Sequence, residues 1–193
     1  MLNVGILIFD EVEVLDFAGP FEVFSIAEDE NNCKIFNVFT ISEKEEIFAR
    51  NGLGVKAQYA LDHAPHLDIL VIPGGYGAKH IQFKNTQLLN WIKTRYIQLK
   101  IIFSVCTGAF ILAEAGLLMN LKATTHWMEL SRLKREYPQI EVIDHAKYVD
   151  EGKVVTSGGI SSGIHASLYI VARLKGIDIA LKTAKIMEFE TNF

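Results

Sequence analysis

Cysteine is scarce in this chain, since Cys33 and Cys106 are the only two among 193 residues. Two cysteines are too few for a disulfide framework, which favours a reducing compartment and predicts a cytoplasmic protein. Basic residues are scattered, and 19 lysines and arginines stand against 23 acidic residues, for a formal net charge of −4. Without a basic stripe to neutralise phosphates, we expect no nucleic-acid binding by this chain alone.

The sequence also lacks a signal peptide pattern, a linker and an internal repeat. Its apolar N-terminus has no basic segment before it and turns acidic at Asp10, so it predicts a first strand. The apolar stretch 101–118 contains Glu114 and two glycines, so we interpret it as a buried strand and helix and expect no membrane association. Half of the residues are hydrophobic. One domain over residues 1–193 is therefore expected.

Apolar runs alternate with helical patterns along most of the chain. This alternation predicts an α/β fold with a mostly parallel sheet and helices on both faces. We expect strands over 2–9, 34–41, 68–72, 101–105, 123–127, 140–143 and 154–157, and a hairpin around Asn51-Gly52. We expect one helix whose start is marked by Asp16 and Pro20, with Pro20 near the first helical position, and another that begins at Thr107. Further helices are expected over 88–96, 128–137, 163–174 and 178–189, the last with Asp178 as N-cap.

Cys106 lies where a buried strand passes directly into a helix. A nucleophile at such a corner is held on a sharp turn at the carboxyl end of the sheet. A helix N-terminus lowers the pKa of a thiol, so we expect Cys106 to be largely thiolate at neutral pH. The alternative is that Cys106 is a small buried core residue. Cys33, in a polar turn, has no such setting.

Asp16 follows the first strand, at the edge of the sheet where Cys106 is also expected. Its carboxyl group is a candidate general acid or base, and the alternative is that it caps the next helix. Asp10, Glu11 and Glu13, nearby, are expected to form a solvated loop. Gly74 and Gly75 follow another strand, and their N–H groups are candidates for an oxyanion nest, with an ordinary loop as the alternative.

Three further residues complete the candidate site. Thr107 follows the cysteine and offers a backbone N–H and a hydroxyl. His126 is the preferred pocket histidine, although a structural role is the commoner one for a lone histidine, and Tyr76 is a candidate for substrate binding beside the glycines. The histidines have no spacing typical of metal ligands, so we expect no metal site.

Four segments carry a family resemblance: PGGYG at 73–77, SVCTGAFILAEAGLL at 104–118, ATTHW at 123–127 and TSGGISSGI at 156–164. They resemble the ThiJ/PfpI superfamily, relatives of class I glutamine amidotransferases. The resemblance covers essentially the whole chain and implies a flavodoxin-like three-layer sandwich that forms a homodimer. The chain is most similar to isonitrile hydratases and to the ligand domains of some AraC-type regulators.

The resemblance implies catalytic roles for Asp16, Cys106 and Thr107, as in isonitrile hydratases. Such an enzyme is a hydro-lyase that adds water to an isonitrile and gives an N-substituted formamide, without a cofactor. Protease-like members have a histidine directly after the cysteine, and Thr107 in that place argues against a peptidase. Two alternatives stay open: a glyoxalase or deglycase acting on methylglyoxal-type carbonyls, and a non-catalytic sensor of small molecules or redox state.

Overall fold

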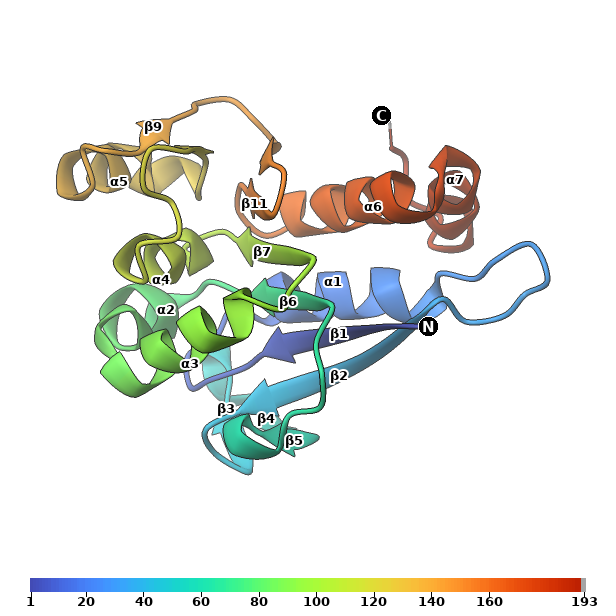
Figure 1. The fold of residues 1–193 in the computed structure, drawn as a ribbon, viewed down its shortest axis with the longest axis horizontal. Coiled ribbons are helices and arrows are strands. Elements are labelled where there is room, and N and C mark those ends of the chain that lie inside the picture. Colours follow the sequence, from blue (N-terminus) through green and yellow to red (C-terminus); the bar gives the residue numbers. More distant parts are fainter. Residues whose placement is uncertain (192–193) are drawn as a thin grey trace.

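A seven-stranded sheet forms the centre of the computed structural model, which describes residues 1–191 (Figure 1). The strand order is β10-β11-β7-β6-β1-β2-β5, and all neighbours are parallel except β10 and β11. The strands are β1 (Leu2–Leu7), β2 (Phe36–Ser42), β5 (Tyr59–Ala60), β6 (Ile69–Ile72), β7 (Ile101–Val105), β10 (Tyr148–Glu151) and β11 (Val154–Ser157). The predicted mostly parallel sheet is confirmed.

Helices cover both faces of this sheet, as predicted. The helices are α1 (Val14–Ile26), α2 (Tyr76–His80), α3 (Thr86–Tyr96), α4 (Gly108–Glu114), α5 (Leu130–Glu136), α6 (Ser162–Lys175) and α7 (Ile177–Ile186), of which α5 packs against β9 and not against the central sheet. The chain moves from β1 to β2 in one direction and from β6 to β7 and β11 in the other. Because crossovers between parallel strands are right-handed, this reversal puts α1 and α3 on opposite faces of the sheet. Helices α6 and α7 lie on the same face as α1 and pack against it (Figure 1).

Two small sheets lie outside the central one. The first pairs β3 (Glu46–Phe48) with β4 (Gly54–Lys56), and Asn51 and Gly52 between them have φ of 59° and 80°, which confirms the expected hairpin. The second pairs β8 (Lys122–Ala123) with β9 (Glu141–Val142) in parallel. The strands expected over 123–127 and 140–143 are therefore shorter than predicted, and neither joins the main sheet.

Two predicted helix starts are wrong. Helix α1 begins at Val14, so Pro20 lies inside it, and Glu13 occupies the N-cap position. Helix α7 begins at Ile177 after Gly176, which leaves Asp178 in the first turn. Local rules for proline and caps failed in α1 because the side chain of Asp16 is used for contacts across the sheet edge.

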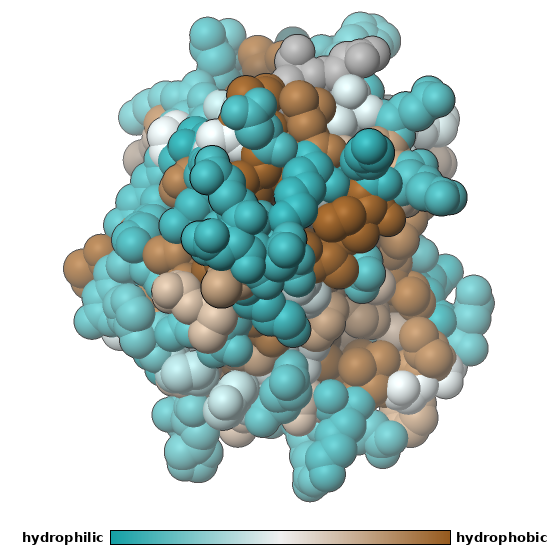
Figure 2. All heavy atoms as spheres, turned by 90° about the vertical axis from the view of Figure 1, so that its right-hand side faces the viewer, coloured by the Kyte–Doolittle hydropathy of each residue, from teal (hydrophilic) through white to brown (hydrophobic). Residues whose placement is uncertain are grey.

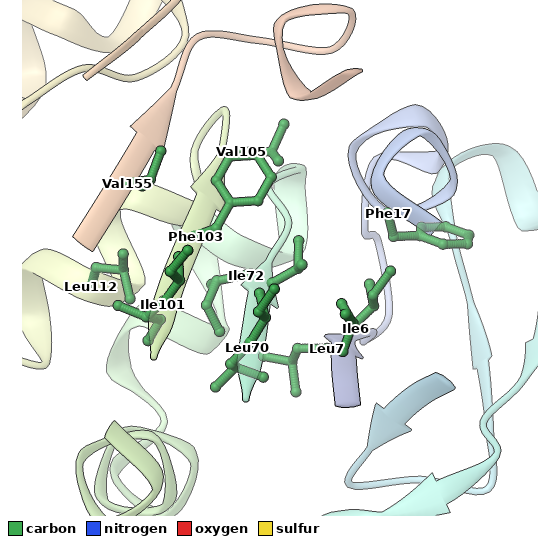
Figure 3. Packing of buried hydrophobic residues seen from close by; sticks show 14 of the residues in the cluster. Ile6, Leu7, Phe17, Leu70, Ile72, Ile101, Phe103, Val105, Leu112 and Val155 are labelled. Atoms are coloured by element: carbon green, nitrogen blue, oxygen red, sulfur yellow. The ribbon is translucent and has the colours of Figure 1, made fainter. Parts of the chain in front are cut away.

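The core fills the space on both faces of the central strands (Figure 3). Such burial on both faces is typical of parallel strands, which therefore form near-continuous apolar runs in the sequence. Fully or almost fully buried side chains come from four adjacent strands and two helices: Ile6, Leu7, Phe17, Leu70, Ile72, Ile101, Phe103, Val105, Leu112 and Val155. This packing holds the carboxyl ends of β1, β6, β7 and β11 along one edge.

The end of the molecule where the central strands begin is covered mostly by polar side chains, with hydrophobic patches between them (Figure 2). In residues 1–191, no helix combines the length and apolar character needed to cross a membrane.

Candidate functional site

Cys106 lies on a strained turn between β7 and α4. It adopts a φ of 55°, a left-handed conformation that costs a non-glycine residue roughly 1–2 kcal/mol. The Cys106 N–H donates to the carbonyls of Ser157 and Gly158 at 3.2 and 3.1 Å, and the Cys106 carbonyl accepts from the Thr125 hydroxyl at 2.7 Å. These bonds tie the turn to the end of β11 and to the segment after β8. The predicted strand–cysteine–helix corner is confirmed.

Asp16 is completely buried and sits behind Cys106. Its Oδ2 accepts from the Gly74 N–H at 3.1 Å and its Oδ1 accepts from the Ile160 N–H at 3.2 Å. A third hydrogen bond joins its carboxyl group to the Cys106 thiol. The alternative that Asp16 caps α1 is therefore wrong, because its side chain joins the loops after β6, β7 and β11.

Burial governs the protonation of this pair. Desolvation is the main cause that raises the pKa of Asp16 to about 7, against the opposing hydrogen bond from Cys106, and the nearby charge of Glu13 raises it further. Desolvation and the negative charge of Asp16 raise the pKa of the Cys106 thiol well above its ordinary value, although the Thr107 N–H opposes them. The expectation of a thiolate at neutral pH is therefore wrong. Above about pH 7 the pair is a thiol that donates to a carboxylate, and below that pH Asp16 is protonated as well.

Thr107 and the two glycines support this pair. The Thr107 hydroxyl accepts from the Gly75 N–H at 2.9 Å and lies 3.1 Å from the Gly75 carbonyl. A Cβ on Gly74 would lie 2.6 Å from the Thr107 nitrogen and 2.8 Å from Asp16 Oδ2, so only glycine fits there. The N–H groups expected to form an oxyanion nest are thus used within the site, where they orient Asp16 and Thr107.

A pocket of about 220 Å³ opens in front of Cys106. Its walls come from six separate parts of the chain and consist of Glu13, Arg50, Gly75, Tyr76, Lys79, Cys106, Thr107, His126, Met128, Glu129 and Ile160. Five of the seven residues predicted for the site border the pocket. The other two, Asp16 and Gly74, lie behind its inner wall.

Several lining residues were missed or misassigned from the sequence. Glu13 was expected in a solvated loop. Lys79 and Glu129 form an ion pair at 2.6 Å across the pocket wall, and no sequence signal joins positions 50 residues apart. Ile160 has a φ of 52°, which is a genuine outlier for a β-branched residue and is typical of strain stored at functional sites. Its place inside the TSGGISSGI segment was the only hint.

His126 is fixed by its neighbours. Its Nδ1 accepts from the Met128 N–H at 3.3 Å, so the neutral ring carries its proton on Nε2. Among residues 1–191, no group of three or more histidine, cysteine, aspartate or glutamate side chains is arranged to hold a metal ion.

A sequence model of the DJ-1/PfpI family matches residues 3–173 of the chain. The chain belongs to the DJ-1/PfpI family. The superfamily named from the sequence motifs is confirmed, and the central parallel sheet agrees with the DJ-1 structures that the chain resembles.

Three relatives show how this family member compares with others. Isonitrile hydratase from Pseudomonas putida is 30% identical over 192 residues, which cover 100% of this chain and 78% of the enzyme. The HTH-type transcriptional regulator GbdR from Pseudomonas aeruginosa is 22% identical over 97% of this chain, which spans only 51% of the regulator. A crystal structure of a ThiJ/PfpI family protein from Pseudomonas syringae aligns with a TM-score of 0.86, at 24% identity, over 100% of this chain and 76% of that one.

The raised pKa of Asp16 predicts how stability depends on pH. The folded protein holds a proton on Asp16 up to about pH 7, whereas the unfolded chain loses it near pH 4. Between these values the folded state binds more protons, so this carboxyl group should lower the free energy of unfolding by about 1.4 kcal/mol per pH unit as pH rises. Urea unfolding at several pH values should show this slope, and Asp16→Asn should reduce it. An unchanged slope in Asp16→Asn would contradict the assignment.

Gly74→Ala tests the close packing around the pair. The added methyl group would displace Thr107 or Asp16, so we expect a loss of about 1–3 kcal/mol in the free energy of unfolding. Gly152→Ala is the control for a glycine with open space around it, although its φ of 77° adds local strain of its own. Chemical denaturation measures both. If both variants lose the same free energy of unfolding, the loss at Gly74 is no larger than the backbone strain at Gly152 alone, and tight packing at Gly74 is contradicted.

Proposed function

We propose that this protein is a cysteine-dependent hydro-lyase of the isonitrile hydratase type. The observation that carries the proposal is the buried hydrogen-bonded pair of Asp16 and Cys106, with Thr107 beside it, at the base of a pocket. A carboxyl group whose pKa is about 7 exchanges its proton easily at neutral pH, which suits a group that must both accept and return a proton. The similarity to the Pseudomonas putida isonitrile hydratase supports this reaction class.

The first step joins the sulfur of Cys106 to the substrate. The Asp16 carboxylate accepts the thiol proton while the sulfur attacks the terminal carbon of R–N≡C. Asp16 then delivers that proton to the same carbon, and a thioimidate, Cys106–S–CH=N–R, results. The strained turn holds the sulfur between Asp16 and the pocket, so that little reorganisation is needed.

The second step releases the product. Water, oriented by the Thr107 hydroxyl, adds its oxygen to the carbon and one proton to the nitrogen. Asp16 accepts the proton of the new hydroxyl as the C–S bond breaks, the N-substituted formamide leaves, and the proton returns to sulfur. Every atom comes from substrate and water, so the reaction requires no cofactor.

The same proposal includes a setting for the enzyme. We place it in the cytoplasm because of its few cysteines, and we expect a homodimer as in the superfamily that the sequence resembles. Neither a nucleic acid nor a membrane has a part in the reaction.

A second candidate function is a non-catalytic sensor. The match to a transcriptional regulator over 97% of the chain favours it, and in this function the pocket in front of Cys106 would bind a small molecule without converting it. Binding of isonitriles or formamides without turnover would support this function instead of the first.

Turnover of an alkyl isonitrile is the direct test. Wild-type protein should form the N-alkyl formamide, detected by liquid chromatography and mass spectrometry. Cys106→Ala and Asp16→Asn should each lower kcat by at least about 1,000-fold, because the sulfur and its proton acceptor act as one unit. Cys33→Ala is the matched control and should keep full activity, since Cys33 is exposed and does not line the pocket.

Two results would contradict the proposal: no formamide from the wild-type protein, or undiminished formation by Cys106→Ala. A parallel incubation with methylglyoxal separates the glyoxalase alternative, which would produce lactate without glutathione.

The pH profile of kcat/KM gives an independent test. Below about pH 7 the Asp16 carboxyl is protonated and cannot accept the thiol proton. The rate should therefore rise through a single ionisation near pH 7 and then level off. Glu13→Gln should move this ionisation to lower pH, because the charge of Glu13 helps to raise the pKa of Asp16. A rate that falls as pH rises through 7 would exclude Asp16 as the proton acceptor.

A further inference from the structure

A second, larger cavity lies directly beside the Cys106 pocket. Its volume is about 650 Å³, and His126 and Ile160 line both cavities. Pockets that hold small organic ligands usually measure roughly 300–1,000 Å³. The Cys106 pocket, at about 220 Å³, is below this range, whereas the neighbouring cavity is within it. A substrate too large for the Cys106 pocket would extend past His126 and Ile160 into the larger cavity.

The two cavities differ in charge. The Cys106 pocket is lined by Glu13, Arg50, Lys79 and Glu129. Among residues 1–191, the only carboxylate or permanent charge lining the larger cavity is Asp144. The Asp144 side chain is 61% exposed, and its carboxylate lies 3.4 Å from the ring of His145, whose side chain is 94% exposed. Such exposure places this pair at the rim. A charged substituent would thus find no counter-ion in the interior of the larger cavity.

The wall of the larger cavity carries apolar surface and small hydroxyl groups. Trp127 and Leu130 supply apolar area, and Trp127 is 74% exposed to solvent. Ser131 and Ser161 add hydroxyl groups at the border. An exposed indole gains most from contact with another flat ring, because stacking adds to the burial of apolar area.

The shared wall is rigid enough to guide a ligand. The His126 ring is held by the Met128 N–H and lies against Gly159, where a Cβ would come within 2.1 Å of the ring. Only glycine at that position leaves room for the ring at the border of the two cavities.

We propose that the larger cavity is the subsite for the substituent of the substrate, and that this substituent is uncharged and aromatic. This inference rests on the proposed function in one respect only, namely that the reactive end of the substrate meets Cys106. The aromatic group would contact Trp127 and Leu130 while the reactive carbon reaches the sulfur past His126.

Alkylation of Cys106 tests the subsite without relying on turnover. In a Cys33→Ser background, Cys106 is the only thiol, and intact-protein mass spectrometry can follow its reaction with N-methylmaleimide and N-phenylmaleimide. Each rate is divided by the rate of the same reagent with free cysteine. We expect the normalised rate to be at least 10-fold higher for the phenyl reagent.

Two variants of α5 locate the effect. Ser131→Trp fills the cavity from an exposed position, so it should remove the preference for the phenyl reagent. Lys134→Trp, on the same helix but outside the cavity, is the matched control and should keep the preference. Equal normalised rates, a preference that survives Ser131→Trp, or no alkylation by the phenyl reagent would each overturn the inference.

A comparison of methyl and phenyl isonitriles separates this inference from the proposed function. If phenyl preference in alkylation is present but neither isonitrile is hydrated, the subsite stands and the hydratase function fails. If both are hydrated at rates that Ser131→Trp does not change, the function stands and the subsite fails.

Discussion

The buried carboxyl group of Asp16 is the constraint on which the site depends. It accepts hydrogen bonds from the loops after β6 and β11 and contacts the thiol after β7, so one side chain joins four neighbouring strand ends. A buried carboxylate is tolerated only when such donors surround it. Because desolvation still outweighs them, the pKa of Asp16 stays near 7, which is the property that the proposed chemistry uses.

Backbone strain is present at two of the residues that contact this carboxyl group. Cys106 and Ile160 both have positive φ, and hydrogen bonds from both ends hold the Cys106 turn in place. The apolar packing of the central strands supplies the rigidity that such local strain needs (Figure 3). Two adjacent cavities open at this edge of the sheet. The smaller one contains Cys106 and is lined by charged side chains, and the larger one is mainly uncharged.

Much of the architecture could be predicted because it follows from local patterns. The strand Ile101–Val105 and the strand Val154–Ser157 were placed correctly from their apolar runs, and the corner at Cys106 from the direct passage of strand into helix. The start of α1 and the protonation of Cys106 could not be predicted in this way. Local rules favoured a cap at Asp16 and a thiolate at a helix N-terminus, and long-range burial reversed both.

The sequence by itself determined the α/β class, the family motifs and the identity of Asp16, Cys106, Thr107 and His126 as candidates, because each is written in residues close together in the chain. Only the tertiary structure decided how they act on one another. It turned the N–H groups of Gly74 and Gly75 inward, brought Glu13 and Ile160 to the site, and kept the proton on the sulfur. These outcomes depend on desolvation and on contacts between distant loops, which no pattern of neighbouring residues encodes.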